Sequence, residues 1–391
     1  MRRFSFGLDL GHHEWKLTVL EENPHGDLIA FHQAVRNESI VRGEVVDERA
    51  LLDQLDNLIS NLSESLDHYP IRQIGVALSL PQFHVHPAKG YTFPQGAIED
   101  EDIDKAIRMA KTSIAISNQE ILLEHPKQYT LDNEQIVRDP RGMTAKRLDV
   151  EVIFVSAFKP LTEKLRSAFR ELRLTPVILA PSVVLDGQIA LTKREQEVGT
   201  ILLDLGGTTI SLAVHQGGTL QDLKVFPFGG QQLTEDLALH LRVSPEEAEE
   251  LKKNLFREEE GARRPKTRQA GKAGRAAPNR AALRRFLERK FREYGEEEGL
   301  QAYVKDLRKH RKLMGIVLVG GGAVLPPMAD WCKSLLGMPA KVAKSQVNII
   351  EDRDDAPKFF ASAAAAYAAF RTSGGVGLFG KIKGFFRNFI S

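Results

Sequence analysis

Two segments of the sequence place an aspartate where a buried strand gives way to a glycine turn. The first is FGLDLG at residues 6–11, and the second is ILLDLGG at residues 201–207. Glycines let backbone N–H groups approach an anion closely, and a nearby carboxylate can hold a hydrated Mg²⁺ ion. Each segment therefore indicates a phosphate site, although an ordinary hairpin explains a single match equally well.

A third glycine-rich turn favours a phosphate site over the alternative that the first two turns are ordinary hairpins. Residues 315–322 read GIVLVGGG, which predicts a further buried strand that ends in three glycines. Three strand-and-turn units of this kind could surround one nucleotide. We expect the elements that carry them to lie in two halves of one fold, with the turns facing each other.

Composition limits the class of protein. The chain has 391 residues, of which 42% are hydrophobic and 27% charged, so it is long enough for two domains with real cores. The net charge of +2 gives no reason to expect nucleic-acid binding. One cysteine, Cys332, excludes an intrachain disulfide, and no window is apolar enough to span a membrane. These features favour the cytoplasm.

The order of elements predicts an α/β protein with a mixed sheet. Strands are expected at 4–20 around the first turn, at 28–34 and at 71–80, and an amphipathic helix at 48–65 precedes the last of these. Residues 82–157 break this rhythm, with strands near 83–93, 120–131 and 148–157 and a helix near 100–116. That pattern is typical of a small inserted α+β module. A helix at 160–172 and a strand at 176–179 return to the main sheet.

A well-marked helix start follows the second turn and its neighbouring helix at 231–241. Ser244 is a candidate N-cap, Pro245 is suited to the first turn, and Glu247 stands at the capping-box position. The helix carries Glu249 and Lys252 three residues apart, hence on one face. Taken alone, this pair is explained by a solvated ion pair, and ligand binding is the alternative.

Residues 257–281 have almost no apolar bulk and are strongly basic from Gly261 onward. This composition predicts a disordered loop that acts as a solvated tether, with contact to nucleic acid or an acidic peptide as the alternative. An alanine-rich helix at 361–370 and a glycine joint at 371–376 come later.

The last segment, residues 377–391, separates apolar and basic side chains when wound as a helix. The apolar residues occupy an arc of about 140°. The seven apolar positions are Leu378, Phe379, Ile382, Phe385, Phe386, Phe389 and Ile390, and the basic ones are Lys381, Lys383 and Arg387. Docking on the protein's own core is one explanation. The bulk of the apolar side, the basic border and the absence of acids favour an interfacial membrane anchor.

With these features the chain resembles the FtsA family of actin-like bacterial cell-division proteins. The two Asp-Gly turns, the glycine strand and the basic terminal helix carry the resemblance, and the segment EILLEHPKQYTLDNEQIVRDPRGMTAKRLDVEVIFVSA at 120–157 is similar to the inserted subdomain of that family. The resemblance implies an actin-like fold of two lobes. The expected ranges are 1–81 and 158–190 for the first lobe, 82–157 for the inserted subdomain, 191–370 for the second lobe, 371–376 for a linker and 377–391 for the membrane helix.

By this resemblance the chain binds ATP with Mg²⁺ between its lobes. The implied phosphate, ribose and adenosine contacts are Asp9, Gly11, His12, His13, Lys16, Asp204, Gly206, Gly207, Thr208, Thr209, Glu249, Lys252, Gly320, Gly321 and Gly322. Asp9 and Asp204 would bind Mg²⁺ through water, since this ion keeps most of its hydration.

Five residues depart from the family pattern. His12 and His13 stand where a small hydroxyl residue is usual, Thr208 replaces a third glycine, and Ser211 stands where an acid is expected. Ala180 takes the place of a glutamate before the proline. A carboxylate that would hold a metal-bound water is therefore missing, and we expect no catalytic residue and at most weak ATPase activity.

The resemblance implies a role in positioning rather than in metabolism. The expected partners are the C-terminal tail of FtsZ on the lobe that contains 231–311, further copies of the chain in filaments, other divisome proteins, and lipids on the cytoplasmic side of the bacterial cell membrane at the division site. A PilM-like pilus-assembly adaptor and an active ATPase or sugar-kinase relative are the alternatives. The basic terminal helix argues against the first, and the missing acids argue against the second.

Overall fold

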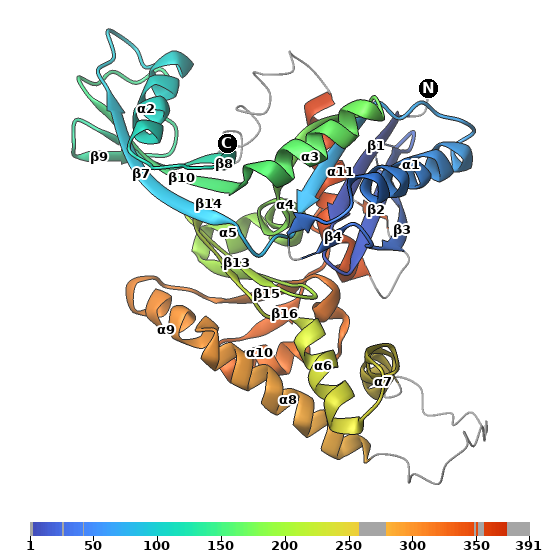
Figure 1. The fold of residues 1–391 in the computed structure, drawn as a ribbon. Helices are drawn as coiled ribbons and strands as arrows, with labels where there is room; N and C mark the ends of the chain where they lie inside the picture. Colours follow the sequence, from blue (N-terminus) through green and yellow to red (C-terminus); the bar gives the residue numbers. More distant parts are fainter. Residues whose placement is uncertain are drawn as a thin grey trace.

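The computed structural model describes residues 3–25, 27–41, 43–257, 279–347, 349–350 and 356–373. Two lobes and a projecting module share this chain, and Figure 1 shows the module beside the first lobe, with the second lobe below both. The turns singled out from the sequence lie where the lobes meet. Among the described residues no helix is long and apolar enough to cross a membrane.

The first lobe is built on a mixed six-stranded sheet with the order β11-β6-β1-β2-β3-β17. β1 pairs antiparallel with β2 and parallel with β6, so the predicted mixed sheet is confirmed. The strands are β1 (Arg3–Leu10), β2 (Glu14–Glu22), β3 (Leu28–Arg36), β6 (Gln73–Leu78), β11 (Thr175–Pro181) and β17 (Ile349–Ile350). A short hairpin, β4 (Ile40–Val41) and β5 (Glu44–Val45), lies beside them.

Helix α1 (Glu48–Ser65) has the bounds predicted from the sequence. Asp47 caps it by accepting the backbone N–H groups of Arg49 and Ala50, and its buried leucines recur every three or four residues. Together with α3 (Lys159–Glu171) it contributes to the core of the first sheet. Both helices could be predicted because their apolar periodicity is local.

Helices α4 (Ser182–Ala190) and α11 (Phe360–Ser373) contact each other and the first sheet. A Cβ atom on Gly7 of β1 would lie 2.1 Å from the backbone oxygen of Ser362, so the helix backbone packs directly on the strand. The alanines of α11 make this close approach possible. The sequence analysis grouped 191–370 in one lobe, whereas β17 pairs in the first sheet and α11 packs on that sheet. The position of α11 could not be predicted because an alanine-rich helix carries no periodicity that indicates which sheet it covers.

The inserted module is an antiparallel sheet with the order β7-β10-β8-β9 and one helix. Its elements are β7 (His84–Thr92), α2 (Asp100–Thr112), β8 (Gln119–Leu131), β9 (Gln135–Val137) and β10 (Leu148–Phe158). The predicted layout agrees with these, except that α2 ends at Thr112 and the three-residue β9 was not expected. The base of the module touches the second lobe, where His125 Nε2 lies 2.7 Å from Thr219 Oγ1.

The second lobe contains a five-stranded sheet with the order β14-β13-β12-β15-β16. The strands are β12 (Thr200–Leu205), β13 (Ile210–Gln216), β14 (Thr219–Phe226), β15 (Gly315–Val319) and β16 (Ala340–Val342). The helices are α5 (Lys193–Val198), α6 (Gly230–Leu241), α7 (Pro245–Arg257), α8 (Arg280–Glu297), α9 (Leu300–His310) and α10 (Met328–Leu336). Two 3-10 turns, η1 (Gly321–Val324) and η2 (Ala356–Phe359), lie near the lobe boundary.

Three sequence-based predictions fall wholly or mainly outside the described residues. Most of the basic loop at 257–281 lies there, because residues 258–278 are not described. Residues 374–376 of the joint and the whole amphipathic segment at 377–391 also lie outside. The disordered tether and the membrane helix therefore stay predictions.

Candidate nucleotide site

The first aspartate turn is a β-hairpin that pairs its acid with a buried lysine. Asp9 on β1 and Lys16 on β2 are opposite each other in the register. Lys16 Nζ lies 3.2 Å from Asp9 Oδ2, and both side chains are largely buried. Burial by itself lowers the pKa of Lys16, but Asp9, with smaller contributions from Glu14 and Asp204, raises that pKa above its ordinary value. Lys16 thus carries a positive charge into the site.

The backbone of this turn is held in place by Asn37. Its Nδ2 donates to the backbone oxygen of His12 at 2.6 Å, and its backbone N–H donates to that of His13 at 3.0 Å. A Cβ atom on Gly207 would lie 3.6 Å from the Cβ of His13, so the first turn reaches the second across the lobe boundary. The structure therefore brings the two turns together, as the sequence predicts, and places His13 at their contact.

The second turn links β12 to β13 and is anchored by helix α6. The Gly206 N–H donates to the Thr209 oxygen at 2.9 Å, which closes the turn. The oxygens of Gly206 and Gly207 accept the N–H groups of Gly230 and Gln231 at 3.0 and 2.7 Å. The start of α6 thus holds the turn, and Thr208 lies within it.

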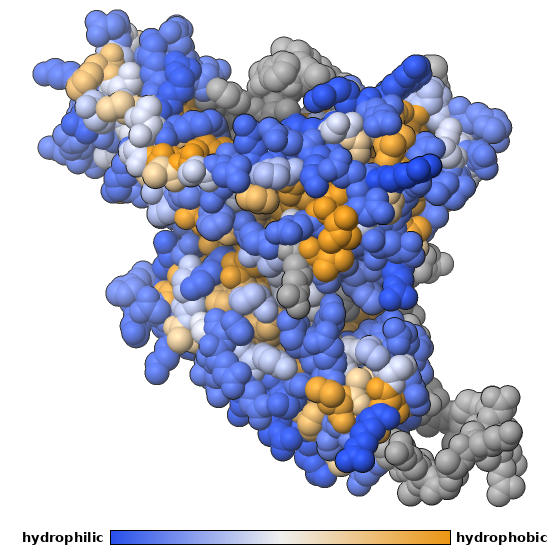
Figure 2. Space-filling model, in the orientation of Figure 1, coloured by the Kyte–Doolittle hydropathy of each residue, from blue (hydrophilic) through white to orange (hydrophobic). Residues whose placement is uncertain are grey.

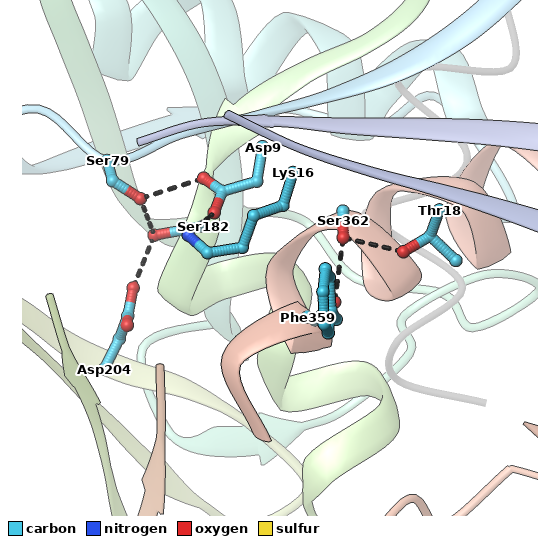
Figure 3. Close-up of polar contacts among 8 residues, drawn as sticks. All are labelled: Asp9, Lys16, Thr18, Ser79, Ser182, Asp204, Phe359 and Ser362. Carbon is cyan, nitrogen blue, oxygen red and sulfur yellow. Dashed lines mark hydrogen bonds and ion pairs between the residues drawn. The ribbon is translucent and has the colours of Figure 1, made fainter. Parts of the chain in front are cut away.

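A chain of hydrogen bonds joins the two aspartates across the lobes (Figure 3). Ser79 Oγ lies 3.3 Å from Asp9 Oδ1 and 3.0 Å from Ser182 Oγ, and Ser182 Oγ donates to Asp204 Oδ2 at 2.8 Å. These three links share two hydroxyl hydrogens. Because Ser182 directs its hydrogen at Asp204, the single hydroxyl hydrogen of Ser79 can serve either Asp9 or Ser182 at any one time.

The second aspartate lies in a buried environment close to another acid. Burial, together with the nearby charge of Asp9, raises the pKa of Asp204 to about 6, although the Ser182 hydrogen bond and Lys16 oppose the shift. No Lys or Arg in the described part of the chain forms an ion pair with Asp204. The second turn therefore carries a carboxylate whose negative charge lacks a direct partner.

Four residues of this site were missed by sequence reasoning: Asn37, Ser79, Ser182 and Asp186. Asp186 lies one turn after Ser182 on α4, is 1% exposed, and its Oδ1 has no hydrogen-bond partner among the described residues. Burial, with the charges of Asp204 and Asp9, raises the pKa of Asp186 well above its ordinary value. An acid inside the apolar run VILAPSVVLDGQIA was the available signal. The serines and the asparagine gave none, because their types are common in loops.

The third glycine turn packs against the second. Gly320 has φ +87°, and a Cβ atom there would lie 2.3 Å from Asp204 Oδ1. A side chain at this position would be strained and would also displace the carboxylate. A Cβ atom on Gly322 would similarly lie 2.9 Å from the Cβ of Leu205, while Gly321 has open space around it. All three predicted turns thus meet at the lobe boundary.

Glu249 and Lys252 lie on α7, close to the second turn. Lys252 Nζ is 2.6 Å from Glu249 Oε2, and the lysine side chain is 6% exposed. Burial lowers the pKa of Lys252, opposed by Glu249, and Lys252 in turn keeps the pKa of Glu249 low in spite of burial. The pair is thus a largely buried, charge-compensated one. The solvated surface pair considered from the sequence is not what the structure contains.

Of the two positions where acids are missing, one lies beside Asp204 and the other is in the hydrophobic core. Ala180 is fully buried on β11, and Ser211 on β13 pairs in register with Asp204 and is 3% exposed. Within the described ranges no group of three or more His, Cys, Asp and Glu side chains is placed to hold a metal ion. Any metal bound here would keep water in most of its coordination positions, as Mg²⁺ does.

Comparison with known families agrees with this architecture. Residues 201–365 match the family model described as "Cell division protein FtsA", and residues 86–156 match the one described as "SHS2 domain inserted in FTSA". The chain belongs to the FtsA family. The resemblance drawn from the sequence is therefore confirmed, and the inserted module of β7 to β10 is the family's inserted domain.

Curated relatives named "Cell division protein FtsA" match at the same level of identity. The protein of Streptococcus pneumoniae serotype 2 (strain D39 / NCTC 7466) is 26% identical over 372 residues, which cover 88% of this chain and 77% of the relative. That of Bacillus subtilis (strain 168) is 26% identical over 63% of this chain, and the chain spans 57% of that relative's length. For Escherichia coli (strain K12) the shares are 59% and 58%, also at 26% identity.

Solved structures confirm the actin-like fold. The "PilM-PilN type IV pilus biogenesis complex" has a TM-score of 0.69 at 17% identity, covering 93% of this chain and 98% of that one. MreB 5 of Spiroplasma citri bound to AMPPNP has a TM-score of 0.52 at 14% identity, covering 95% and 97%. At these identities the likeness concerns the fold alone.

Proposed function

We propose that this protein is an actin-like cell-division protein that binds ATP with Mg²⁺ between its lobes, polymerises on the cytoplasmic membrane and tethers FtsZ polymers to it. The observation that carries the nucleotide part is the meeting of three glycine turns around Asp9 and Asp204. Family membership supports the cell-division part. The amphipathic segment at 377–391 supports membrane attachment.

The donor set at the lobe boundary fits a hydrated Mg²⁺ ion. Asp204 is a buried carboxylate that pairs with no Lys or Arg among the described residues, and Asp9, Ser79 and Ser182 place further side-chain oxygen atoms nearby. Oxygen ligands that act mainly through water are what Mg²⁺ prefers. In this proposal Asp9 and Asp204 hold the hydrated ion, which would neutralise phosphate charge, and Lys16 supplies a second cation.

The phosphates would be contacted by backbone N–H groups of the turns at Gly11 to His13 and Gly206 to Thr209. Adenosine would lie against Gly320 to Gly322. MreB 5 of Spiroplasma citri has been solved bound to ADP and bound to AMPPNP, which supports a nucleotide in the corresponding fold here. Because Ala180 and Ser211 stand in place of acids, we expect very slow turnover.

The second lobe offers a surface for the C-terminal tail of FtsZ within residues 231–311. Figure 2 shows apolar side chains gathered on this face of the second lobe, over α6 and α7. Leu239 on α6 is 77% exposed, and its neighbour His240 stacks on Phe286 of α8 with ring centroids 4.4 Å apart. The Arg289 guanidinium lies 5.6 Å from the Phe286 ring. An apolar surface with a basic border suits a short peptide that carries both apolar and acidic residues.

A binding and reconstitution experiment separates this function from the pilus-adaptor alternative. Fluorescence polarisation with a labelled FtsZ tail peptide should give saturable binding with a Kd on the order of micromolar. Leu239→Glu should weaken it at least tenfold, whereas Met314→Glu, at another exposed apolar position of the lobe, should not. Absence of saturable binding to the full chain would favour the PilM-like reading, which shares the fold.

Membrane attachment is tested by sedimentation with anionic liposomes. The full chain should pellet with them, and it should carry FtsZ polymers into the pellet. Phe385→Glu places a charge in the apolar arc and should abolish pelleting, while Lys383→Gln should weaken it chiefly at low salt. A Phe385→Glu protein that still pellets would mean that residues 377–391 do not anchor the chain.

A further inference from the structure

The ammonium group of Lys252 is fully engaged by protein oxygens. Its Nζ lies 2.6 Å from Glu249 Oε2, 2.6 Å from Thr234 Oγ1 and 2.8 Å from the backbone oxygen of Gly230. An ammonium group has three hydrogens, and here three acceptors lie within hydrogen-bond distance. With 6% of its side chain exposed, Lys252 has no donor left over for a ribose or a base.

The oxygen of Gly230 connects this lysine to the second aspartate turn. Gly230 begins α6, and its N–H donates to the Gly206 oxygen at 3.0 Å. The next residue, Gln231, donates to the Gly207 oxygen at 2.7 Å. A Cβ atom on Gly229 would lie 2.5 Å from the Gly206 oxygen, so the two segments are in direct contact. Lys252, the start of α6 and the second turn form one hydrogen-bonded unit.

Thr234 closes the unit from the other side. Its hydroxyl lies 3.0 Å from the Gly230 oxygen and also contacts Glu249. Glu249 therefore balances the lysine charge inside the unit, and its other oxygen lies 3.5 Å from the exposed Lys253. Removal of the Lys252 ammonium would leave a partly buried carboxylate and the Gly230 oxygen without their shared donor.

We propose that Lys252 is a positioning residue, which holds the second aspartate turn in its phosphate-binding shape through α6, and that it does not itself touch ribose or base. The inference rests on the proposed function in one respect, namely that an adenine nucleotide binds at the lobe boundary. It differs from the role that the family resemblance implies for this lysine. The proposal predicts that loss of Lys252 weakens the binding of a ligand's phosphates and leaves the binding of its nucleoside unchanged.

The first experiment needs no ligand. Amide hydrogen exchange of the nucleotide-free full chain is compared for wild type, Lys252→Met and Lys253→Met. The Gly230 and Gln231 amides should exchange at least tenfold faster in Lys252→Met and at the wild-type rate in Lys253→Met, which alters a neighbouring exposed lysine with the same carboxylate partner. Unchanged exchange in Lys252→Met would overturn the positioning role.

The second experiment uses ADP and adenosine as probes on the same three proteins, with Kd measured by calorimetry for ADP and by ligand-observed NMR for adenosine. Lys252→Met should weaken ADP at least tenfold and change adenosine less than twofold. Equal losses for both would assign Lys252 to ribose or base and overturn the proposal. A wild-type chain that binds neither probe would instead refute the proposed nucleotide function. The hydrogen-exchange experiment would still test the positioning role of Lys252, because it is done without a ligand. Thr234→Val, which removes a link without removing charge, replaces Lys252→Met if that variant does not fold.

Discussion

The two aspartate turns share one sequence pattern but differ in how their charge is balanced. In the first turn Asp9 has Lys16 at 3.2 Å within the same hairpin. In the second, Asp204 accepts a hydrogen bond from Ser182, and its pKa is raised to about 6 by burial and by Asp9. The charge of Asp9 is balanced by a lysine within the first turn, whereas the charge of Asp204 is not balanced within the second. The difference indicates where an added cation would be most favourable, and it can be tested by removing charge from each turn.

The largest effect is expected from Lys16→Met. This change leaves the buried Asp9 without its cation, and breaking a buried ion pair costs about 3 to 5 kcal/mol of unfolding free energy. Urea denaturation of the nucleotide-free protein measures it. Lys105→Met, which removes an exposed i,i+4 pair on α2, is the control and should cost less than about 0.5 kcal/mol. Equal, small losses in both variants would mean that the first turn does not depend on its ion pair.

Removal of the Asp204 charge from the second turn should stabilise the protein, whereas Lys16→Met in the first turn should destabilise it. Because folding raises the pKa of Asp204 from 3.8 to about 6, the folded state favours its protonated form. The contribution of Asp204 to the unfolding free energy should therefore fall as pH rises from about 4 to 6 and then level off, with a total on the order of 3 kcal/mol. In Asp204→Asn this contribution is absent.

The measurement is the difference between wild-type and Asp204→Asn unfolding free energies from pH 4 to 8, without Mg²⁺ or nucleotide. The variant should become the more stable protein above pH 6. A difference that stays constant over this range, or that favours wild type as pH rises, would contradict an uncompensated Asp204.

Ser182→Ala gives a smaller effect that sharpens the same comparison. The Ser182 hydrogen bond lowers the pKa of Asp204, so its loss should move the pH-dependent fall in stability to higher pH. The cost in unfolding free energy at pH 7 should be about 1 kcal/mol. The same pH series measures the shift. If the midpoint stays at the wild-type value, the serine chain does not control the second aspartate.

Much of the fold could be predicted because its signals are local. The bounds of α1 follow from the cap at Asp47 and a regular leucine face, and the two hairpins follow from strands that end in Asp-Leu-Gly. The attachment of α11 and β17 to the first sheet could not be predicted, since alanine periodicity and a two-residue strand indicate no partner. The terminal amphipathic segment is a prediction that the described residues do not test.

The residues of the candidate site also fall into those that the sequence could predict and those that it could not. Glycines and aspartates are rare enough in buried strand ends to be noticed, and the three turns they mark do meet. Ser79 comes from one segment and Ser182 and Asp186 from another, helix α4, and these residues gain their importance by being brought near the two aspartates. The hydrogen bonds of Lys252 likewise depend on how two helices, α6 and α7, pack together, so the spacing of Glu249 and Lys252 alone could not distinguish a ligand contact from a support.

Isothermal titration with Mg²⁺ and ATP determines whether the two turns form one nucleotide site. The wild-type chain should bind one ATP at pH 7.5 with strong dependence on Mg²⁺. Asp204→Ala should weaken binding at least tenfold, while Asp56→Ala on the exposed face of α1 should bind as wild type does. Absence of binding to the wild-type chain, or equal binding by Asp204→Ala, would mean that the two turns do not form a nucleotide site.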